Sequence, residues 1–284
     1  MTKVGVQMLR GLYTATAGML AQQRRTEMLS NNMANANTAG YKADQASVRA
    51  FPEMLLNRLE NKSVPTTNGS SFGQITPIGS INTGAYVQEL QSTFSQGGLK
   101  ETGLYSDVAL LEEIIPLNAE TNVKGALFFA VQNQAGEERY TRNGHFTRDN
   151  NGILLSGGNP VLSTTGQPIS IQSSEFQVTP DGEVIADGEF VAQIDVRFEA
   201  DVRNLVKEGN GLYRTFNNEE LPTAVNNENI QYNLRQNYLE TSTVDVGRTY
   251  TDMMTAYRSF EANQKVLQAY DKSMDKAANE IGRI

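Results

Sequence analysis

The residues that could do chemistry are few, and their types exclude several kinds of site. The 284-residue chain has no cysteine and a single histidine, His145. Without thiols there is no disulfide, thiolate zinc site or cysteine nucleophile, and one histidine cannot supply a two-histidine metal motif. His145 follows Asn143-Gly144, a hairpin signal. We therefore expect His145 to be a surface strand residue and not a general base.

Paired carboxylates are the other candidate catalytic groups. Glu112-Glu113 and Glu137-Glu138 are adjacent in sequence, and neighbours in a strand point to opposite faces, so neither pair suits acid/base catalysis. A calcium loop that began at Asp149 would need a glutamate at its twelfth position, where the chain has Pro160. We expect a hairpin turn there. The sequence thus predicts no catalytic residue, no metal, no cofactor and no enzyme activity.

Charge and hydropathy exclude two classes of partner. The chain has 24 basic and 32 acidic residues, a net charge of −8, and no basic run that would bind a nucleic-acid backbone. No apolar run approaches the ~20 residues that a membrane-spanning helix needs, so we expect no membrane insertion. A charged segment followed by an apolar stretch is missing at the N-terminus, so no Sec-type signal peptide is expected.

Both ends of the chain carry a narrow apolar seam with a heptad period. Residues spaced alternately four and three apart run from Met8 to Met33, and again from Tyr250 to Ile281. A seam of this width suits a partner helix better than the broad face of a core helix. The candidate subunit-interface residues on these seams are Leu12, Met19, Thr26, Leu29, Met33, Tyr250, Met253, Tyr257, Phe260, Leu267, Met274 and Ile281.

An ordinary core helix is the alternative interpretation of each seam. It is weakened because the middle of the chain contains no comparable helix for the ends to pack on. Gly18 and several threonines also lower the helix propensity of the first seam. Burial against a partner should therefore decide whether these ends are ordered, and we predict frayed ends in an isolated monomer.

Between the ends the pattern changes. Asn and Thr after residue 30, followed by Gly40, indicate a sharp turn. The segment Ala43–Leu59 looks partly helical with Pro52 near a start, and Asn61–Gly84 has the composition of a linker or extended arm. From about Ala85 to Leu239, short strands separated by turn signals indicate an antiparallel β domain. The predicted fold class is α+β, with long N- and C-terminal helices that pair as a coiled coil around a central, mainly antiparallel β domain.

Several segments resemble the bacterial flagellar rod and hook protein family. Leu9–Met19 and the Ser-Asn-Asn-x-Ala-Asn block within Ser30–Lys42 are similar to its N-terminal signature, and Gln236–Gly247 with Tyr257–Asn263 to its C-terminal signature. The middle of the chain resembles the β domain of the rod branch, and the chain looks most like the distal-rod group, including the Bacillus-type hook–basal body rod paralogue. The signature residues are Ser30, Asn31, Asn32, Ala34, Asn35, Gly40 and Tyr41.

The resemblance implies a structural, axial protein of the bacterial flagellum that serves motility. Residues 8–40 and 240–284 would form a coiled-coil core, 41–84 a connecting region or extended arm, and 85–239 an outer β domain. Subunits would leave the cell by flagellar type III export and form a helical assembly, the hollow drive shaft of the basal-body rod, with copies of themselves and with other rod and hook subunits. The protein would therefore be located at the extracytoplasmic basal body.

The chain departs from the rod pattern in two places. Leu111–Lys124 is inserted where rod proteins usually run directly from one strand into the next. The usual start of the family lies near Met8, so Met1–Gln7 is either an upstream start or a segment foreign to the native chain. Two alternatives remain open at this point. One is a hook or hook-junction component of the same family. The other, from a different class, is a secreted carbohydrate-active β-domain protein, which would need two carboxylates converging on one cleft.

Overall fold

The computed structural model describes residues 2–63, 71–173 and 175–281, with side chains described over residues 11–54, 78–173 and 175–279. The chain divides into two compact units, each assembled from segments far apart in the sequence. Unit 1 comprises Met1–Asn31, Gln45–Gln91 and Gly247–Ile284, and unit 2 comprises Asn32–Asp44 and Ser92–Val246. Both ends of the chain therefore belong to unit 1.

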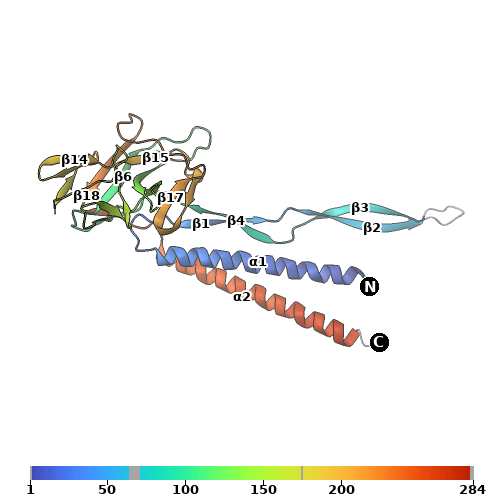
Figure 1. Ribbon diagram of the computed structural model, residues 1–284. Coiled ribbons are helices and arrows are strands. Elements are labelled where there is room, and N and C mark those ends of the chain that lie inside the picture. Colours follow the sequence, from blue (N-terminus) through green and yellow to red (C-terminus); the bar gives the residue numbers. More distant parts are fainter. Residues whose placement is uncertain (1, 64–70, 174, 282–284) are drawn as a thin grey trace. The chain divides into compact units, whose positions relative to one another are not determined.

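Two long helices, α1 (Thr2–Ala34) and α2 (Val246–Lys276), dominate unit 1 (Figure 1). A short π-helical segment, Ala277–Ile281, continues α2. The heptad seams thus lie on helices, as predicted. Contacts join Gly18 to Asn263 and Arg25 to Asp252, so residue numbers rise along one helix as they fall along the other. The two helices are therefore antiparallel to each other.

A glycine in the middle of α1 allows close approach of α2. A Cβ atom at Gly18 would lie 3.0 Å from the Asn263 amide nitrogen, and one at Gly11 would meet the Tyr270 hydroxyl. Glycine lowers helix propensity by ~1 kcal/mol relative to alanine. The contact with α2 gives these positions a packing reason that offsets the lower propensity.

The segment between the first helix and the β domain forms strands. β1 (Asp44–Ala50) pairs with β4 (Ala85–Ser92), and β2 (Met54–Ser63) pairs antiparallel with β3 (Ser71–Ile81) in a two-stranded hairpin (Figure 1). The linker or extended arm expected over Asn61–Gly84 therefore contains the regular strand β3 in its described part. Residues 64–70, between the paired strands, lie outside the described residues.

The prediction of partial helix over Ala43–Leu59 is wrong, because β1 and β2 occupy this segment. Pro52 lies between these strands, has no amide hydrogen, and disfavours helix in the residue before it. That residue, Phe51, donates its amide to the Gly84 carbonyl at 2.9 Å. Leu, Glu and Arg favour helix locally, but pairing of β1 with β4 and of β2 with β3 overrides this preference.

Unit 2 is a β domain of short strands. Its five-stranded sheet has the order β15-β7-β8-β17-β16, two three-stranded sheets have the orders β11-β10-β9 and β12-β13-β14, and the remaining strands pair as β18-β6 and β19-β5. Every pairing that the structure describes here is antiparallel, which confirms the α+β class. The strands are β5 (Leu99–Glu101), β6 (Val108–Ile114), β7 (Ala126–Gln132), β8 (Glu138–Thr141), β9 (Phe146–Arg148), β10 (Leu154–Ser156), β11 (Asn159–Pro160), β12 (Phe176–Val178), β13 (Glu183–Ala186), β14 (Glu189–Gln193), β15 (Val196–Glu199), β16 (Leu205–Lys207), β17 (Leu212–Thr215), β18 (Gln231–Gln236) and β19 (Tyr238–Glu240).

Strand β7 lies at the centre of the unit 2 core, with both faces buried. Phe129 packs into the larger cluster, with its ring 5.3 Å from that of Phe146 in an edge-to-face contact. Phe128 points the other way, into a cluster that includes Tyr140 and Tyr213. A strand buried on both faces is expected to be a continuous apolar run, and β7 fits that rule. In the described part of the chain, no helix is both long and apolar enough to cross a bilayer.

Candidate assembly interface

The predicted seam residues of α1 lie in covered or partly covered positions. Leu29 is buried, in a small cluster with Met28 and Ala256. Thr26 satisfies its hydroxyl by donating to the carbonyl one turn earlier, at 2.9 Å, which is the usual arrangement for a helical threonine. The half-buried members of the seam are Leu12, Met19, Thr26 and Met33.

On α2 the predicted seam divides between a covered and an exposed flank. Tyr250 and Tyr257 are 55% and 51% exposed, whereas Thr249 and Ala256, one residue earlier in each case, are buried. The covered stripe is therefore centred one position before the tyrosines. The half-buried seam residues are Met253, Phe260, Leu267 and Met274, and the side chain of Ile281 lies outside the described side chains.

The exposed flank of α2 carries large apolar side chains at helical spacing. Tyr250, Met254 and Tyr257 follow one another at intervals of four and three, so they share one face of the helix. All three are classed as exposed, Met254 at 36%. On α1, Tyr13 and Leu20 are also exposed, seven residues apart. Unit 1 thus presents apolar side chains that the described part of this chain does not cover.

In unit 2, Asn32 organises the turn that follows α1. Its side-chain amide donates to the Asp44 carbonyl at 2.8 Å, and its side-chain oxygen accepts the Asp44 amide at 3.0 Å and the Tyr41 hydroxyl at 3.2 Å. Asn32 is buried. One side chain therefore closes a loop of twelve residues by occupying the backbone groups at its far end.

Gly40 and Tyr41 join this turn to the segment that precedes α2. Gly40 has a φ of 67°, and a Cβ atom there would collide with the Arg142 carbonyl. Its amide donates to the Glu240 carbonyl at 2.9 Å, and the Thr243 amide donates to the Tyr41 carbonyl at 3.1 Å. These constraints explain why glycine is required at position 40.

The Tyr41 side chain lies in a charged environment. The Lys207 ammonium lies 4.0 Å from the centre of the Tyr41 ring and 2.9 Å from an Asp44 carboxylate oxygen. Burial, with a contribution from Asp44, raises the pKa of the Tyr41 hydroxyl, so it stays protonated. Of the other signature residues, Ser30, Asn31 and Ala34 are exposed. Asn35 is half-buried and accepts a hydrogen bond from the Thr38 hydroxyl at 3.2 Å.

Near the end of this turn, Lys42 belongs to a buried ion cluster that ties four distant segments of unit 2 together. Lys42 pairs with Glu240 at 2.7 Å, and Arg142 bridges Glu240 at 2.9 Å and Glu112 at 3.0 Å. Each of the four side chains is at most 2% exposed. Two cations and two anions balance, as burial of charge requires.

Backbone carbonyls accept further hydrogen bonds from the two cations of the cluster. Lys42 donates to the Ser95 carbonyl at 2.7 Å, and Arg142 donates to the carbonyls of Leu127 at 2.9 Å and Leu110 at 3.2 Å. Because each charged group has hydrogen-bond partners, the cluster has the geometry that makes a buried ion pair tolerable. Removal of one partner would leave an uncompensated buried charge.

The electrostatics of Lys42 and Glu240 differ because both lie beside Arg142. Burial and repulsion by Arg142 lower the pKa of Lys42 to about 8, in spite of its pairing with Glu240. Burial would raise the pKa of Glu240, but attraction to Arg142 and Lys42 outweighs it and holds that pKa below its usual value. Arg142 is therefore the fixed charge that keeps Glu240 ionised.

Lys42 and Glu240 lie in the N- and C-terminal signature segments, but the sequence does not predict a role for either residue. The pair is 198 positions apart, so no local pattern reveals it. A usable signal existed at one end, because Lys42 is the single charged residue between Asn31 and Ala43. A lone charge in a signature of amides and small residues favours a buried partner over a solvated position.

The residues first considered for chemistry fall where expected. The His145 side chain is 49% exposed, with Nδ1 2.6 Å from a buried Asp107 oxygen. Glu112 and Glu113 point apart, since Glu112 is in the buried cluster while Glu113 is exposed. Asp149 accepts the amides of two following residues at the turn between β9 and β10, which confirms a hairpin turn there.

Comparison with protein-family models matches three parts of the chain. Residues 12–42 match the model described as flagella basal body rod protein, 122–186 the flagellar hook protein FlgE/F/G D1 domain, and 235–280 the flagellar basal body rod FlgEFG protein C-terminal domain. The first contains the Asn32 turn and Lys42, and the last contains Glu240. Two of the four clustered charges thus lie in the matched ends of the chain.

Similar proteins agree over nearly the full length. The chain is 56% identical over 277 residues to the flagellar hook-basal body complex protein FlhO of Bacillus subtilis, covering 98% of this chain and 100% of that protein. It is 30% identical to the flagellar basal-body rod protein FlgG of Agrobacterium fabrum, covering 93% and 96%, and 29% identical to FlgG of Bacillus subtilis, covering 96% and 99%. The chain belongs to the flagellar basal-body rod and hook–basal body protein family.

Proposed function

We propose that this protein is a distal-rod-type subunit of the flagellar basal body, which polymerises into the hollow shaft between motor and hook. The observation that carries the proposal is the exposed apolar face of α2, formed by Tyr250, Met254 and Tyr257. Full burial of such a side chain stabilises an interface by about 1.5–3 kcal/mol, as an upper estimate. Copies of the same helix, and of related axial proteins, are the partners of matching chemistry.

In this proposal, subunits polymerise because each contact joins two unlike surfaces of neighbouring copies. The exposed face of α2 and the exposed residues Tyr13 and Leu20 of α1 lie on different helices of one unit. A contact between two different surfaces repeats from copy to copy and gives an open helix when the rotation does not close. In this proposal α1 and α2 form a coiled coil, residues 8–40 and 240–284 form the inner tube, and residues 85–239 form the outer domain.

The connecting segment 41–84 completes the proposed contacts. Two-stranded ribbons are only marginally stable alone in water. On the described side chains of the β1–β4 ribbon, Val48, Tyr86 and Leu90 are exposed. Neighbouring subunits in the shaft would cover such a ribbon and order it. Export through the flagellar type III apparatus before folding, and an extracytoplasmic position, belong to the same proposal.

Deletion of the gene, followed by electron microscopy of isolated basal bodies, tests this function. We expect shafts that stop short of the hook, and restoration of full shafts by the wild-type gene. Full-length shafts that lack only the hook would instead assign the protein to the hook or its junction. Intact shafts and hooks in the deletion strain would overturn the rod assignment.

A further inference from the structure

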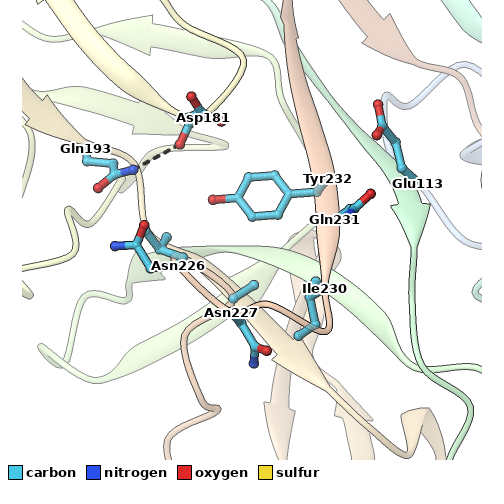
Figure 2. Close-up of a pocket in the computed structure, with 10 residues that line it drawn as sticks. Glu113, Asp181, Gln193, Asn226, Asn227, Ile230, Gln231 and Tyr232 are labelled. Carbon is cyan, nitrogen blue, oxygen red and sulfur yellow. Dashed lines mark hydrogen bonds between the residues drawn. The ribbon is translucent and has the colours of Figure 1, made fainter.

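A polar pocket in unit 2 is not used by the assembly proposal. It has a volume of about 320 Å³, at the lower end of the ~300–1,000 Å³ range of ligand pockets. Figure 2 shows the Tyr232 ring in its centre, with the hydroxyl directed toward Asp181, Gln193 and Asn226. Glu113 comes from β6, Tyr232 from β18, Gln193 from β14, and Asp181 from the turn before β13. The pocket thus collects side chains from four separate elements.

A β-bulge places Glu113 at the pocket. In the β18–β6 ladder, Gln231 lies opposite Ile114 and Tyr232 opposite Glu112, so Glu113 is the extra residue. Bulges redirect a side chain out of the regular alternation. Glu113 lies within Leu111–Lys124, the segment that the resemblance predicts to be an insertion, and it contributes a wall of this pocket.

Backbone hydrogen bonds fix the other walls. The Ile194 amide donates to the Gly182 carbonyl at 2.8 Å, and the Leu234 amide donates to the Pro180 carbonyl at 2.9 Å. These bonds hold the turn that carries Asp181 against β14 and β18. The Gln193 side-chain amide also donates to the Asp181 carbonyl at 3.0 Å. The pocket is therefore formed before any ligand binds.

The polar groups that line the pocket face solvent. Glu113, Asp181, Asn226 and Gln231 are exposed and Tyr232 is half-buried, and within the described part of the chain their side chains form no hydrogen bond with another protein group. Burial, followed by the negative charges of Asp181 and Asp195, raises the pKa of the Tyr232 hydroxyl to about 12. This hydroxyl therefore remains a donor, and such groups usually find a partner when covered.

We propose that this pocket binds a saccharide, with the Tyr232 ring against the apolar face of a sugar ring and the surrounding carboxylates and amides on its hydroxyls. Among the described residues, no lysine or arginine lines the pocket, which disfavours phosphate and other anions. A bare cation would use only acceptors and would leave the donors of Asn226, Gln231 and Tyr232 unsatisfied. Sugar hydroxyls both donate and accept, so they satisfy both kinds of group.

Titration of the full-length, isotope-labelled protein tests the proposal by NMR. The probes are tri-N-acetylchitotriose, maltotriose and, as a cationic comparison, trilysine. We expect one of the oligosaccharides to shift the amide signals of Asp181, Asn226 and Tyr232 with a dissociation constant in the millimolar range. Trilysine should leave these signals in place.

Two variants and a matched control locate the binding. Asp181→Ala should weaken binding about tenfold or more, and Tyr232→Phe about threefold to tenfold, since the first removes a charge-assisted acceptor and the second a neutral donor. Glu220→Ala alters a different pocket of unit 2 and should leave the affinity for the oligosaccharide unchanged. The proposal would be overturned if neither oligosaccharide shifted these signals, or if trilysine alone did. It would also be overturned if the shifts caused by an oligosaccharide persisted unchanged in Asp181→Ala.

Discussion

At the scale of single residues, the signature turn is explained by backbone geometry and buried charge. Asn32 occupies the backbone of Asp44, Gly40 takes a conformation that a side chain would oppose, and Lys42 enters the ion cluster. Each residue has a different physical task, and none of the three tasks is catalytic. The turn therefore joins the chain that leaves α1 to Glu240, at the end of the strand β19 that precedes α2.

Gly40→Ala tests the close approach at the turn. The positive φ alone should cost about 1–2 kcal/mol, and collision with the Arg142 carbonyl should add about 1–3 kcal/mol. Gly166→Ala is the matched control, because Gly166 has a φ of 76° but no atom within 4 Å of the place that a Cβ atom would occupy. Chemical denaturation measures both. Equal losses of unfolding free energy in the two variants would contradict the argument.

The lowered pKa of Lys42 predicts a pH dependence with a definite sign. Its folded-state pKa of about 8 lies below the unfolded value of 10.5, so between these values the unfolded chain binds the proton more tightly. Stability from this group therefore rises with pH across that window, by about 3 kcal/mol in total. The gap in unfolding free energy between wild type and Lys42→Met should widen accordingly.

Urea denaturation at a series of pH values from 8 to 10.5 measures this gap. Lys100→Met is the control, because Lys100 is exposed and its replacement should give a gap that stays nearly constant with pH. A gap between wild type and Lys42→Met that narrows as the pH rises would show that the sign is wrong.

At the scale of elements, the two helices combine an inner contact with an outer face. The seam on α2 was predicted from a heptad that begins at Tyr250, but the covered stripe passes through Thr249 and Ala256. The stripe that this chain covers is thus displaced by one residue from Tyr250 and Tyr257, and the contact of the predicted seam with other subunits stays a prediction. A heptad period shows that a helix has an apolar face. Which residues of that face contact the neighbouring helix depends on tertiary contacts, which no local sequence pattern reveals.

The exposed face of α2 predicts a defect in assembly without a defect in folding. The double variant Tyr250→Ser/Tyr257→Ser should change the unfolding free energy by no more than about 0.5 kcal/mol, because both rings are half-exposed or more. The same variant should fail to restore shaft length and motility to a deletion strain. Phe190→Ser, which alters a 63% exposed ring of unit 2, should restore both. Full rescue by the double variant would remove α2 from the interface.

The elements differ in how far the sequence predicted them. Helices at both ends and an antiparallel β domain followed from period and turn signals, because these patterns are local. The strands β1 and β2 were mistaken for helix, since their identity depends on pairing with β4 and β3. The ion cluster was missed for the same reason, because Lys42, Glu112, Arg142 and Glu240 meet only in the folded unit.

At the scale of the whole molecule, stability is distributed unevenly. In unit 2 every residue of β7 except the last is buried. In α2, by contrast, the buried residues among the described side chains are Thr249 and Ala256, both in its first three turns. Side chains from Leu267 onward are at best half-buried. We therefore expect the ends of the chain to become fully ordered where other subunits add surface to them.

Amide hydrogen exchange on dilute protein tests this distribution directly. We expect strong protection in β7, intermediate protection around Ala256, and rapid exchange from Leu267 to Lys276, because opening of a helix end that buries few apolar contacts costs little free energy. In shafts assembled from the same protein, the slow-exchanging region should extend along α2 to these residues. Protection of Leu267–Lys276 in the dilute monomer equal to that of β7 would mean that the end is already complete. In that case the helix would be an ordinary core helix, and its exposed tyrosines would need another explanation.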